Sequence, residues 1–315
     1  MIRGNQLYDY REIANALSPV QFLYHMNFRP FEWQKRVVSD TGKRVILLCS
    51  RQAGKSTIVS SLPYHSAKYY PKSLNIIMAP NEDQAAEDML KVKDFIAHDP
   101  TYIDLKRDGA DIVELANGSR IIIVVATDKA ARGYSRPRTI LLDEASRMPD
   151  VVYKSGVVPM MNNSPDSNLY VLSTPFGQQG FFYDIWTRKP RKGKKGWTKI
   201  FVRTPWNPDP EDPTNLVPAP PEDEFRDWCR GEGVIGYYSP NHMNLDNQLD
   251  ILAEVGIVQY RQEFCCDFVE MNGQVFSNED LARLYGERVE PMVKSNGVGL
   301  TSSALVPKSL GGRFF

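Results

Sequence analysis

The residues best suited to chemistry form one short run directly after a predicted buried strand at Val45–Cys49. In a strand–loop–helix context such a run offers backbone N–H groups and a helix N-terminus to the phosphates of a nucleotide. Lys55 would reach the β- and γ-phosphates, and the Ser56 hydroxyl would bind Mg²⁺. Cys49 stands where the GxxxxGK[ST] pattern has its first glycine. The run consists of Ser50, Arg51, Gln52, Ala53, Gly54, Lys55, Ser56 and Thr57.

A pair of acidic residues follows a second apolar strand, expected over Thr139–Asp143. Parallel α/β sheets bind ligands at the carboxyl ends of their strands, so Asp143 would face the phosphate loop. Asp143 would hold Mg²⁺ through water, and Glu144 would polarise the attacking water. A glutamate after the aspartate favours hydrolysis over kinase chemistry, because an attacking water needs a base.

Two further segments could complete a nucleotide site. The strand Asn168–Ser173 leads into Thr174, and the hydroxyls of Ser173 and Thr174 could sense the γ-phosphate; an ordinary strand-end turn is equally open. Gln34 precedes the first strand, and its amide can both donate to and accept from an adenine edge. The alternative for Gln34 is a solvated helix residue beside a packed Trp33.

Short apolar runs alternate with helical stretches over the first two-thirds of the chain. Helices are expected at 81–98, 149–161 and 181–187, where apolar residues recur at helical spacing. This alternation predicts an α/β fold with a mainly parallel central sheet flanked by helices. The predicted buried strands are Val45–Cys49, Leu74–Ala79, Ile121–Val125, Thr139–Asp143 and Asn168–Ser173.

The composition changes near residue 188. The run Arg188–Lys199 is basic and holds no acid, whereas Pro205–Asp227 is rich in Pro, Asp and Glu. These runs predict a basic loop or hairpin tip followed by an irregular linker. A helical pair is expected over Leu245–Phe264, and a strand with a capped helix over Gln274–Tyr285. The expected organisation is an N-terminal helical segment (1–27), a P-loop ATPase core (28–204), a small linker or lid subdomain (205–290) and a flexible tail (291–315).

Composition excludes several classes of protein. With 42% hydrophobic and 24% charged residues the chain is neither disordered nor fibrous. Its 38 basic and 38 acidic residues cancel, so any DNA contact must come from a local patch. No apolar run approaches the roughly 18 residues of a membrane helix. Four cysteines without a CxxC pair indicate a reducing compartment.

Together, in this order, these motifs resemble the ATPase domain of the large terminase subunit of tailed double-stranded-DNA bacteriophages, the motor that packs DNA into a procapsid. The loop form SRQxGKS, without the first glycine, is itself characteristic of that family. The resemblance covers about residues 28–285. The segments that carry it are Pro30–Gln34 (adenine motif), Ser50–Thr57, Arg132-Gly133, Ile140–Ala145 and Ser173–Pro175 (coupling motif).

The resemblance implies an ASCE-type P-loop NTPase that uses ATP and Mg²⁺. By it Glu144 is the catalytic base, and Arg51 contacts the phosphates of the nucleotide. Arg132 would reach the ATP of a neighbouring subunit as an arginine finger, with Arg136 and Arg138 as rivals; a solvated basic turn is the alternative for all three.

The implied partners are double-stranded DNA, a portal protein and a small terminase subunit, in the cytoplasm of a host cell. The chain is expected to form a homo-oligomeric ring when docked and to be a monomer in isolation, with no membrane contact. Lys192, Lys194 and Lys195 are the DNA-contact candidates, although a solvated disordered loop is equally open.

A full large terminase continues into a nuclease that binds two metals through several carboxylates. The last acids here are Glu287 and Glu290, so we expect that the nuclease domain is absent and that this chain does not cut DNA. The alternatives to a packaging motor are a helicase-like DNA translocase and a non-catalytic ATP-binding assembly module. The intact Lys55, Asp143 and Glu144 argue against loss of catalysis.

Overall fold

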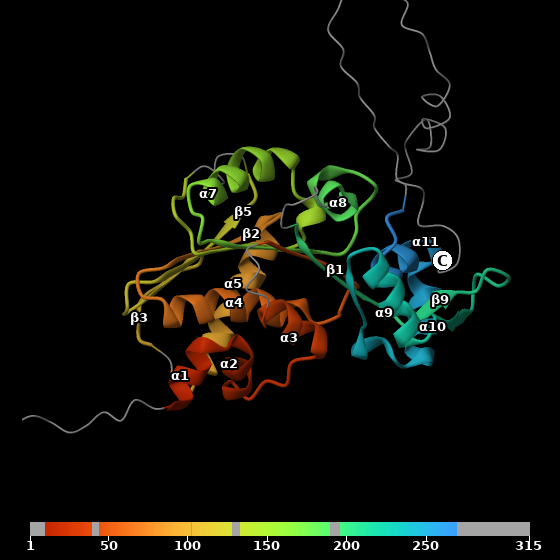
Figure 1. The fold of residues 1–315 in the computed structure, drawn as a ribbon, viewed down its shortest axis with the longest axis horizontal. Coiled ribbons are helices and arrows are strands. Elements are labelled where there is room, and N and C mark those ends of the chain that lie inside the picture. Colours follow the sequence, from red (N-terminus) through yellow and green to blue (C-terminus); the bar gives the residue numbers. More distant parts are fainter. Residues whose placement is uncertain (1–9, 40–43, 102, 128–132, 190–195, 270–315) are drawn as a thin grey trace, which may run out of the picture.

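A nine-stranded sheet lies at the centre of the computed structural model, which describes residues 10–39, 44–101, 103–127, 133–189 and 196–269 (Figure 1). The strand order is β11-β8-β1-β7-β6-β2-β5-β4-β3. Neighbouring strands are parallel except for β4, which pairs antiparallel with β3 and β5. The strands are β1 (Arg44–Cys49), β2 (Leu74–Ala79), β3 (Leu105–Asp108), β4 (Ile112–Leu115), β5 (Arg120–Val125), β6 (Thr139–Leu142), β7 (Asn168–Ser173), β8 (Thr198–Arg203) and β11 (Ile235–Tyr238).

Helices cover both faces of the sheet, with α1 to α5 on one side and α7 and α8 on the other (Figure 1). The remaining helices, α9 to α11, lie together beside β11 and β8. The α-helices are α1 (Tyr10–Leu17), α2 (Pro19–His25), α3 (Glu32–Ser39), α4 (Lys55–Tyr69), α5 (Glu82–Ala97), α7 (Val158–Asn162), α8 (Gly180–Thr187), α9 (Glu222–Gly231), α10 (Leu245–Val255) and α11 (Ile257–Tyr260). Short 3₁₀ turns are η1 (Ala145–Arg147) and η3 (Pro240–His242), and π-helical turns are η2 (Val152–Val157) and η4 (Arg261–Cys265).

The central strands are buried on both faces, as the sequence predicted. On β1, Val45 and Leu47 pack into the core beneath the sheet, and Ile46 and Leu48 pack into the core on the opposite face. A parallel strand covered by helices on both sides reads as a continuous apolar run for this reason. The predicted α/β fold with a mainly parallel sheet is confirmed.

The acidic segment after residue 204 is more ordered than the sequence indicated. In place of an irregular linker over Pro205–Asp227 it forms a hairpin of β9 (Trp206–Pro208) and β10 (Leu216–Pro218) and the start of α9. The acids at the start of α9 face the positive end of the helix dipole, which stabilises the helix. They are a helix-start signal that we interpreted as a charge run.

One strand of the main sheet comes from this same part of the chain. β11 pairs in parallel with β8 at the edge of the sheet, although it lies in the segment 205–290 that we assigned to the linker subdomain. The strand and helix predicted over 274–285 and the tail from 291 lie outside the described residues.

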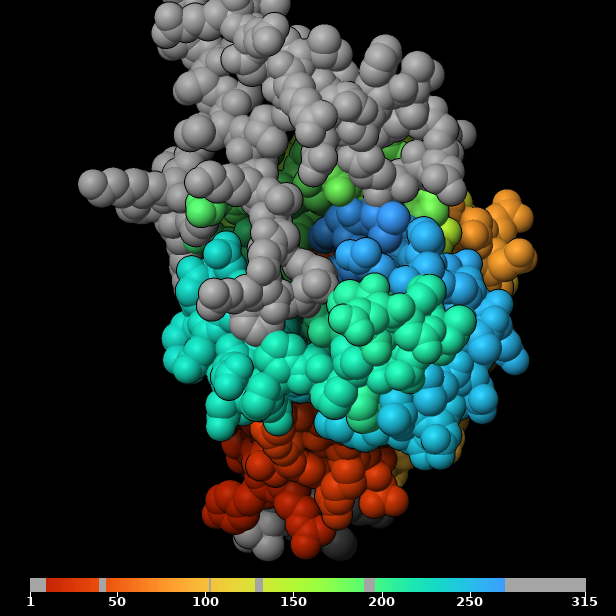
Figure 2. Space-filling view, turned by 90° about the vertical axis from the view of Figure 1, so that its right-hand side faces the viewer, coloured from red at the N-terminus to blue at the C-terminus, as the bar shows by residue number. Residues whose placement is uncertain are grey.

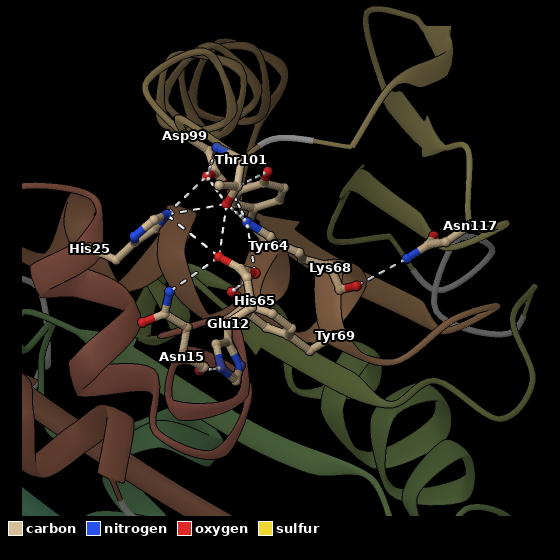
Figure 3. A network of polar contacts seen from close by, with 10 residues as sticks. All are labelled: Glu12, Asn15, His25, Tyr64, His65, Lys68, Tyr69, Asp99, Thr101 and Asn117. Atoms are coloured by element: carbon tan, nitrogen blue, oxygen red, sulfur yellow. Dashed lines mark hydrogen bonds and ion pairs between the residues drawn. The ribbon is translucent and has the colours of Figure 1, made fainter. Parts of the chain in front are cut away.

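The N-terminal helices are joined to the far end of α4 by a network of polar contacts (Figure 3). Lys68 and Asp99, both almost completely buried, form an ion pair of 2.6 Å. Asp99 also accepts a hydrogen bond of 2.8 Å from the Tyr64 hydroxyl, and Lys68 donates to Thr101 at 2.7 Å. Thr101 in turn donates to Glu12 of α1 at 3.0 Å. Burial opposes the charge of Asp99, but these donors, Lys68 first, hold its pKa below the ordinary value.

His65 lies in the same region, where its ring packs edge-on against Phe22 of α2. Its Nε2 lies 2.9 Å from the backbone oxygen of Asn15, a contact that the neutral ring makes as a donor. Burial lowers the pKa of His65 to about 4. The folded protein therefore keeps His65 neutral at pH values where the unfolded chain is protonated.

We predict that His65 makes the protein less stable as the pH falls from about 6.5 towards 4. The unfolded chain binds a proton in this interval that the folded protein refuses, which lowers the free energy of unfolding by about 3 kcal/mol. In His65→Gln, which cannot titrate, urea denaturation followed between pH 7 and pH 4.5 should show a shallower pH dependence. The exposed His98→Gln is the control and should retain the wild-type profile; equal slopes for all three proteins would contradict the prediction.

Candidate active site

The predicted phosphate loop lies between the carboxyl end of β1 and the start of α4, whose first residue is Lys55. Gly54 precedes the helix with a φ of 103°, a conformation that favours glycine. A Cβ atom at Gly54 would also lie only 3.1 Å from the Nε2 atom of Gln34. Both the backbone angle and the packing therefore require glycine at this position.

Gln34 is buried beneath this loop. Its Oε1 accepts a hydrogen bond of 2.8 Å from the backbone N–H of Phe31, and its Nε2 donates one of 2.9 Å to the backbone oxygen of Gly54. The side chain thus ties the start of α3 to the phosphate loop. Its contact with adenine stays a prediction, and the present contacts supply a second role that the sequence did not indicate.

Asp143 lies at the carboxyl end of β6, held by a hydrogen bond of 2.9 Å from its backbone N–H to the oxygen of Met78 on β2. The side chain is buried, and its Oδ1 has no hydrogen-bond partner. Burial raises the pKa of Asp143 although the ammonium group of Lys55 opposes this. An unpaired buried carboxylate oxygen has spare lone pairs of the kind that Mg²⁺ binds, so this residue fits the expected metal role.

A second carboxylate near Asp143 was missed at the sequence level. Asp88 on α5 is fully buried, and its Oδ1 accepts a hydrogen bond of 3.0 Å from the Nε2 of Gln84, which also reaches Asp143 Oδ2 at 3.4 Å. Burial, and then the charge of Asp143, raise the pKa of Asp88 to about 7. The available signal was a pair of polar residues four apart on the apolar face of the predicted helix 81–98.

Lys55 and Glu144 form an ion pair across the mouth of the site. Although burial disfavours both charges, the pair raises the pKa of Lys55 and lowers that of Glu144, so both are ionised near neutral pH. Glu144 has a φ of 49°, in the left-handed region that non-glycine residues seldom adopt. Such a backbone is kept where the surroundings hold it in place, and it is common at active sites.

The predicted coupling residues contact the same glutamate. The hydroxyls of Ser173 and Thr174 each lie 3.4 Å from Glu144 Oε2. Ser146, which the sequence did not single out, lies 2.8 Å from the Ser173 hydroxyl and donates to the Thr174 backbone oxygen at 2.8 Å. These hydroxyls join the end of β7 to the glutamate and to the turn that follows it.

The outer side of the phosphate loop is braced by residues from the C-terminal part of the described chain. Glu263 accepts a hydrogen bond of 2.7 Å from the Arg51 guanidinium, and its backbone oxygen accepts one of 2.7 Å from the Arg51 N–H. The side-chain amide of Asn241 donates to the backbone oxygen of Gln52 at 2.8 Å. Figure 2 shows this part of the molecule, with the segment around α9 to α11 facing the viewer.

The other predicted site residues are not brought together with the loop. Arg136 and Arg138 precede β6, at the edge of the sheet opposite to the phosphate loop. From there they cannot reach the nucleotide site of their own chain. Arg132 and the DNA-contact candidates Lys192, Lys194 and Lys195 lie outside the described residues. Among the described residues no cluster of three or more His, Cys, Asp or Glu side chains forms a metal site.

Comparison with known proteins follows from this geometry. The chain matches the family model described as "Terminase large subunit, T4likevirus-type, N-terminal" over residues 46–283. No curated protein sequence matches it.

Solved structures of phage terminases share the fold. The ATPase domain of the Thermus phage P74-26 large terminase is 20% identical, with a TM-score of 0.55 over 79% of this chain and 98% of that one. The HK97 bacteriophage large terminase is 12% identical, with a TM-score of 0.51 over 76% of this chain and 51% of that one. For the large terminase of another, thermophilic bacteriophage the values are 11%, 0.50, 80% and 57%. This chain thus spans about half the length of the last two.

We predict that Gln34→Ala weakens the binding of ATP and GTP to the same extent, about tenfold, because it loosens the phosphate loop that both nucleotides use. Dissociation constants measured by calorimetry for both nucleotides would test this. The exposed Gln21→Ala serves as the control and should bind both normally. A loss confined to ATP would instead show that the amide turns towards adenine when the nucleotide binds.

Proposed function

The chain belongs to the family of large terminase subunits, which act in viral DNA packaging, and from this premise we propose that it hydrolyses ATP to translocate double-stranded DNA into a procapsid. The observation that carries the proposal is the convergence of Lys55, Asp143, Glu144 and the two coupling hydroxyls at one edge of the sheet. Each of these residues has a distinct task in hydrolysis.

Binding of ATP would begin with an exchange of partners. The triphosphate would enter the loop 50–57, and Lys55 would turn from Glu144 to the β- and γ-phosphates. Asp143, through water, and the exposed Ser56 hydroxyl would hold Mg²⁺, which supplies positive charge to the phosphate oxygens. Since the ammonium group leaves Glu144, the carboxylate is freed at the moment when a base is needed.

Hydrolysis would then use Glu144 as the general base. Its Oε1 would take a proton from the attacking water, while Oε2 keeps the contacts to the Ser173 and Thr174 hydroxyls that orient it. Loss of the γ-phosphate would reverse the exchange, and Lys55 would return to Glu144. The hydroxyls of β7 would therefore experience each change in the charge around Glu144.

The Arg51–Glu263 pair gives a path from the nucleotide to the lid. Arg51 is more than half exposed, and its guanidinium can reach either Glu263 or a phosphate of the bound nucleotide. A phosphate carries more negative charge than the carboxylate, so binding of ATP would compete with the brace. We infer that the segment 241–263 changes its contact with the loop during the cycle.

The remaining assignments are also proposals. Arg132 would complete the site of a neighbouring subunit in a ring, and a portal protein and a small terminase subunit would dock in the cytoplasm of the host. In the part of the chain that the structure describes, no helix has the length and apolar character needed to cross a bilayer.

We predict that ATP turnover per chain rises with protein concentration, because a neighbouring Arg132 completes each site, and that Glu144→Gln lowers turnover at least about a hundredfold. Steady-state phosphate release at several protein concentrations would measure both effects. Glu87→Gln, an exposed residue of α5, is the matched control and should hydrolyse ATP normally.

Two outcomes would overturn this scheme in different ways. Tight Mg·ATP binding without turnover at any concentration would favour a non-catalytic assembly module. Unchanged turnover in Glu144→Gln would show that another group is the base.

For the basic run, we predict that Lys192, Lys194 and Lys195 changed together to Ala flatten the salt dependence of duplex binding. Each lost phosphate contact lowers the slope of log K against log salt by about 0.9, so the slope should fall by about 2 to 3. Lys35, Lys91 and Lys93 are paired with carboxylates and form a control triple that should change the slope less. An unchanged slope would remove the run from the DNA-contact surface.

A further inference from the structure

A basic groove lies at the amino-terminal edge of the sheet, opposite to the phosphate loop. Its volume is about 530 Å³, and its lining holds four cationic side chains and no Asp or Glu. The cations are Lys72, Arg120, Arg136 and Arg138. Because the chain as a whole has no net charge, this concentration of one sign is a local feature.

These four cations lack ion-pair partners among the described residues, in contrast to the paired lysines of α3 and α5. Glu114 is the register partner of Arg120 on β4, but no ion pair joins the two side chains. The groove therefore presents uncompensated positive charge, which a negatively charged ligand would neutralise.

The cations form a row along the edge of the sheet. Arg120 begins β5 and is the register partner of Leu74 on β2, and the backbone N–H of Arg138 bonds to the oxygen of Leu74 at 2.7 Å. Neighbouring strands are about 4.8 Å apart, so the backbones of Arg120 and Arg138 are separated by about 10 Å. A row of this length spans more than one phosphate of a nucleic acid strand.

The groove is also held in a fixed shape. The Arg138 guanidinium stacks 3.3 Å from the centre of the Tyr70 ring, which limits its freedom before any ligand binds. Lys72 and Arg136 have φ values of 61° and 53°, a left-handed backbone that non-glycine residues keep only where the surroundings impose it. Three of the four cations are arginines, whose planar fork matches the oxygens of a phosphate.

We propose that this groove binds the phosphodiester backbone of nucleic acid. A second hollow of about 160 Å³ shares Ser135 and Arg136 with the groove and also lacks carboxylates, so the surface extends beyond the reach of one small anion. The choice of DNA over another polyanion rests on the proposed function. The groove is a separate contact from the basic run at 188–199, and it lies on the edge of the sheet that is remote from ATP.

The test uses the double substitution Lys72→Gln with Arg120→Gln, which removes two exposed charges outside the ATP site. Binding of a fluorescent 20-base-pair duplex is followed by anisotropy between 50 and 200 mM NaCl, with and without a non-hydrolysable ATP analogue. We expect at least tenfold weaker binding at 50 mM NaCl and a salt slope lower by about 2, because two phosphate contacts are lost.

Arg226→Gln with Arg230→Gln is the control, since both arginines are already paired with carboxylates of α9. It changes the net charge equally and should leave most of the slope intact. Both double variants should retain wild-type ATP hydrolysis in the absence of DNA, which shows that they are folded.

The proposal is overturned if the duplex does not bind, or if the groove variant keeps the wild-type slope. It is also overturned if calorimetry with inorganic phosphate shows a loss of binding in the groove variant while its duplex slope is unchanged, because the groove would then hold only a small anion. The slope is measured without hydrolysis, so the ATPase activity of the Glu144→Gln pair can fail or succeed independently.

Discussion

The ion pair between Lys55 and Glu144 is the constraint on which the rest of the site depends. Two opposite charges in a mostly buried site are stable only while each has a partner, and removal of one partner leaves the other at high cost. Without nucleotide the two residues satisfy each other, and the base is neutralised by the residue that should bind phosphate. Substrate binding and release of the base are therefore one event rather than two.

The sheet topology explains why the coupling residues are placed to follow this event. Lys55 follows β1 and Glu144 follows β6, and the strand between them is β7, which ends at Ser173. A residue at the carboxyl end of the middle strand must lie between the two charges, whatever its side chain. Its hydroxyl and that of Thr174 then use this position to contact the carboxylate.

The parts of the site that could be predicted are those whose signal is local. A buried strand that leads into the loop 50–57 or into Asp143-Glu144 carries its meaning in a few consecutive residues, and the structure places both at one sheet edge. The three-residue strands β9 and β10 are too short for a periodic pattern, and prolines interrupt them. The contact of Glu263 with Arg51 joins residues 212 positions apart, and no local pattern encodes such a distance.

The helix α4 connects the two edges of the sheet and decides which parts of the molecule can move. It begins at Lys55 in the phosphate loop and ends beside Tyr70 in the basic groove, a length of about 22 Å for 15 residues. Its far end is fixed by the buried pair of Lys68 and Asp99, so the helix cannot slide when the loop changes partners (Figure 3). The groove thus stays at a fixed distance from the nucleotide. Motion driven by hydrolysis must therefore leave the loop by its other side, through the brace at Glu263.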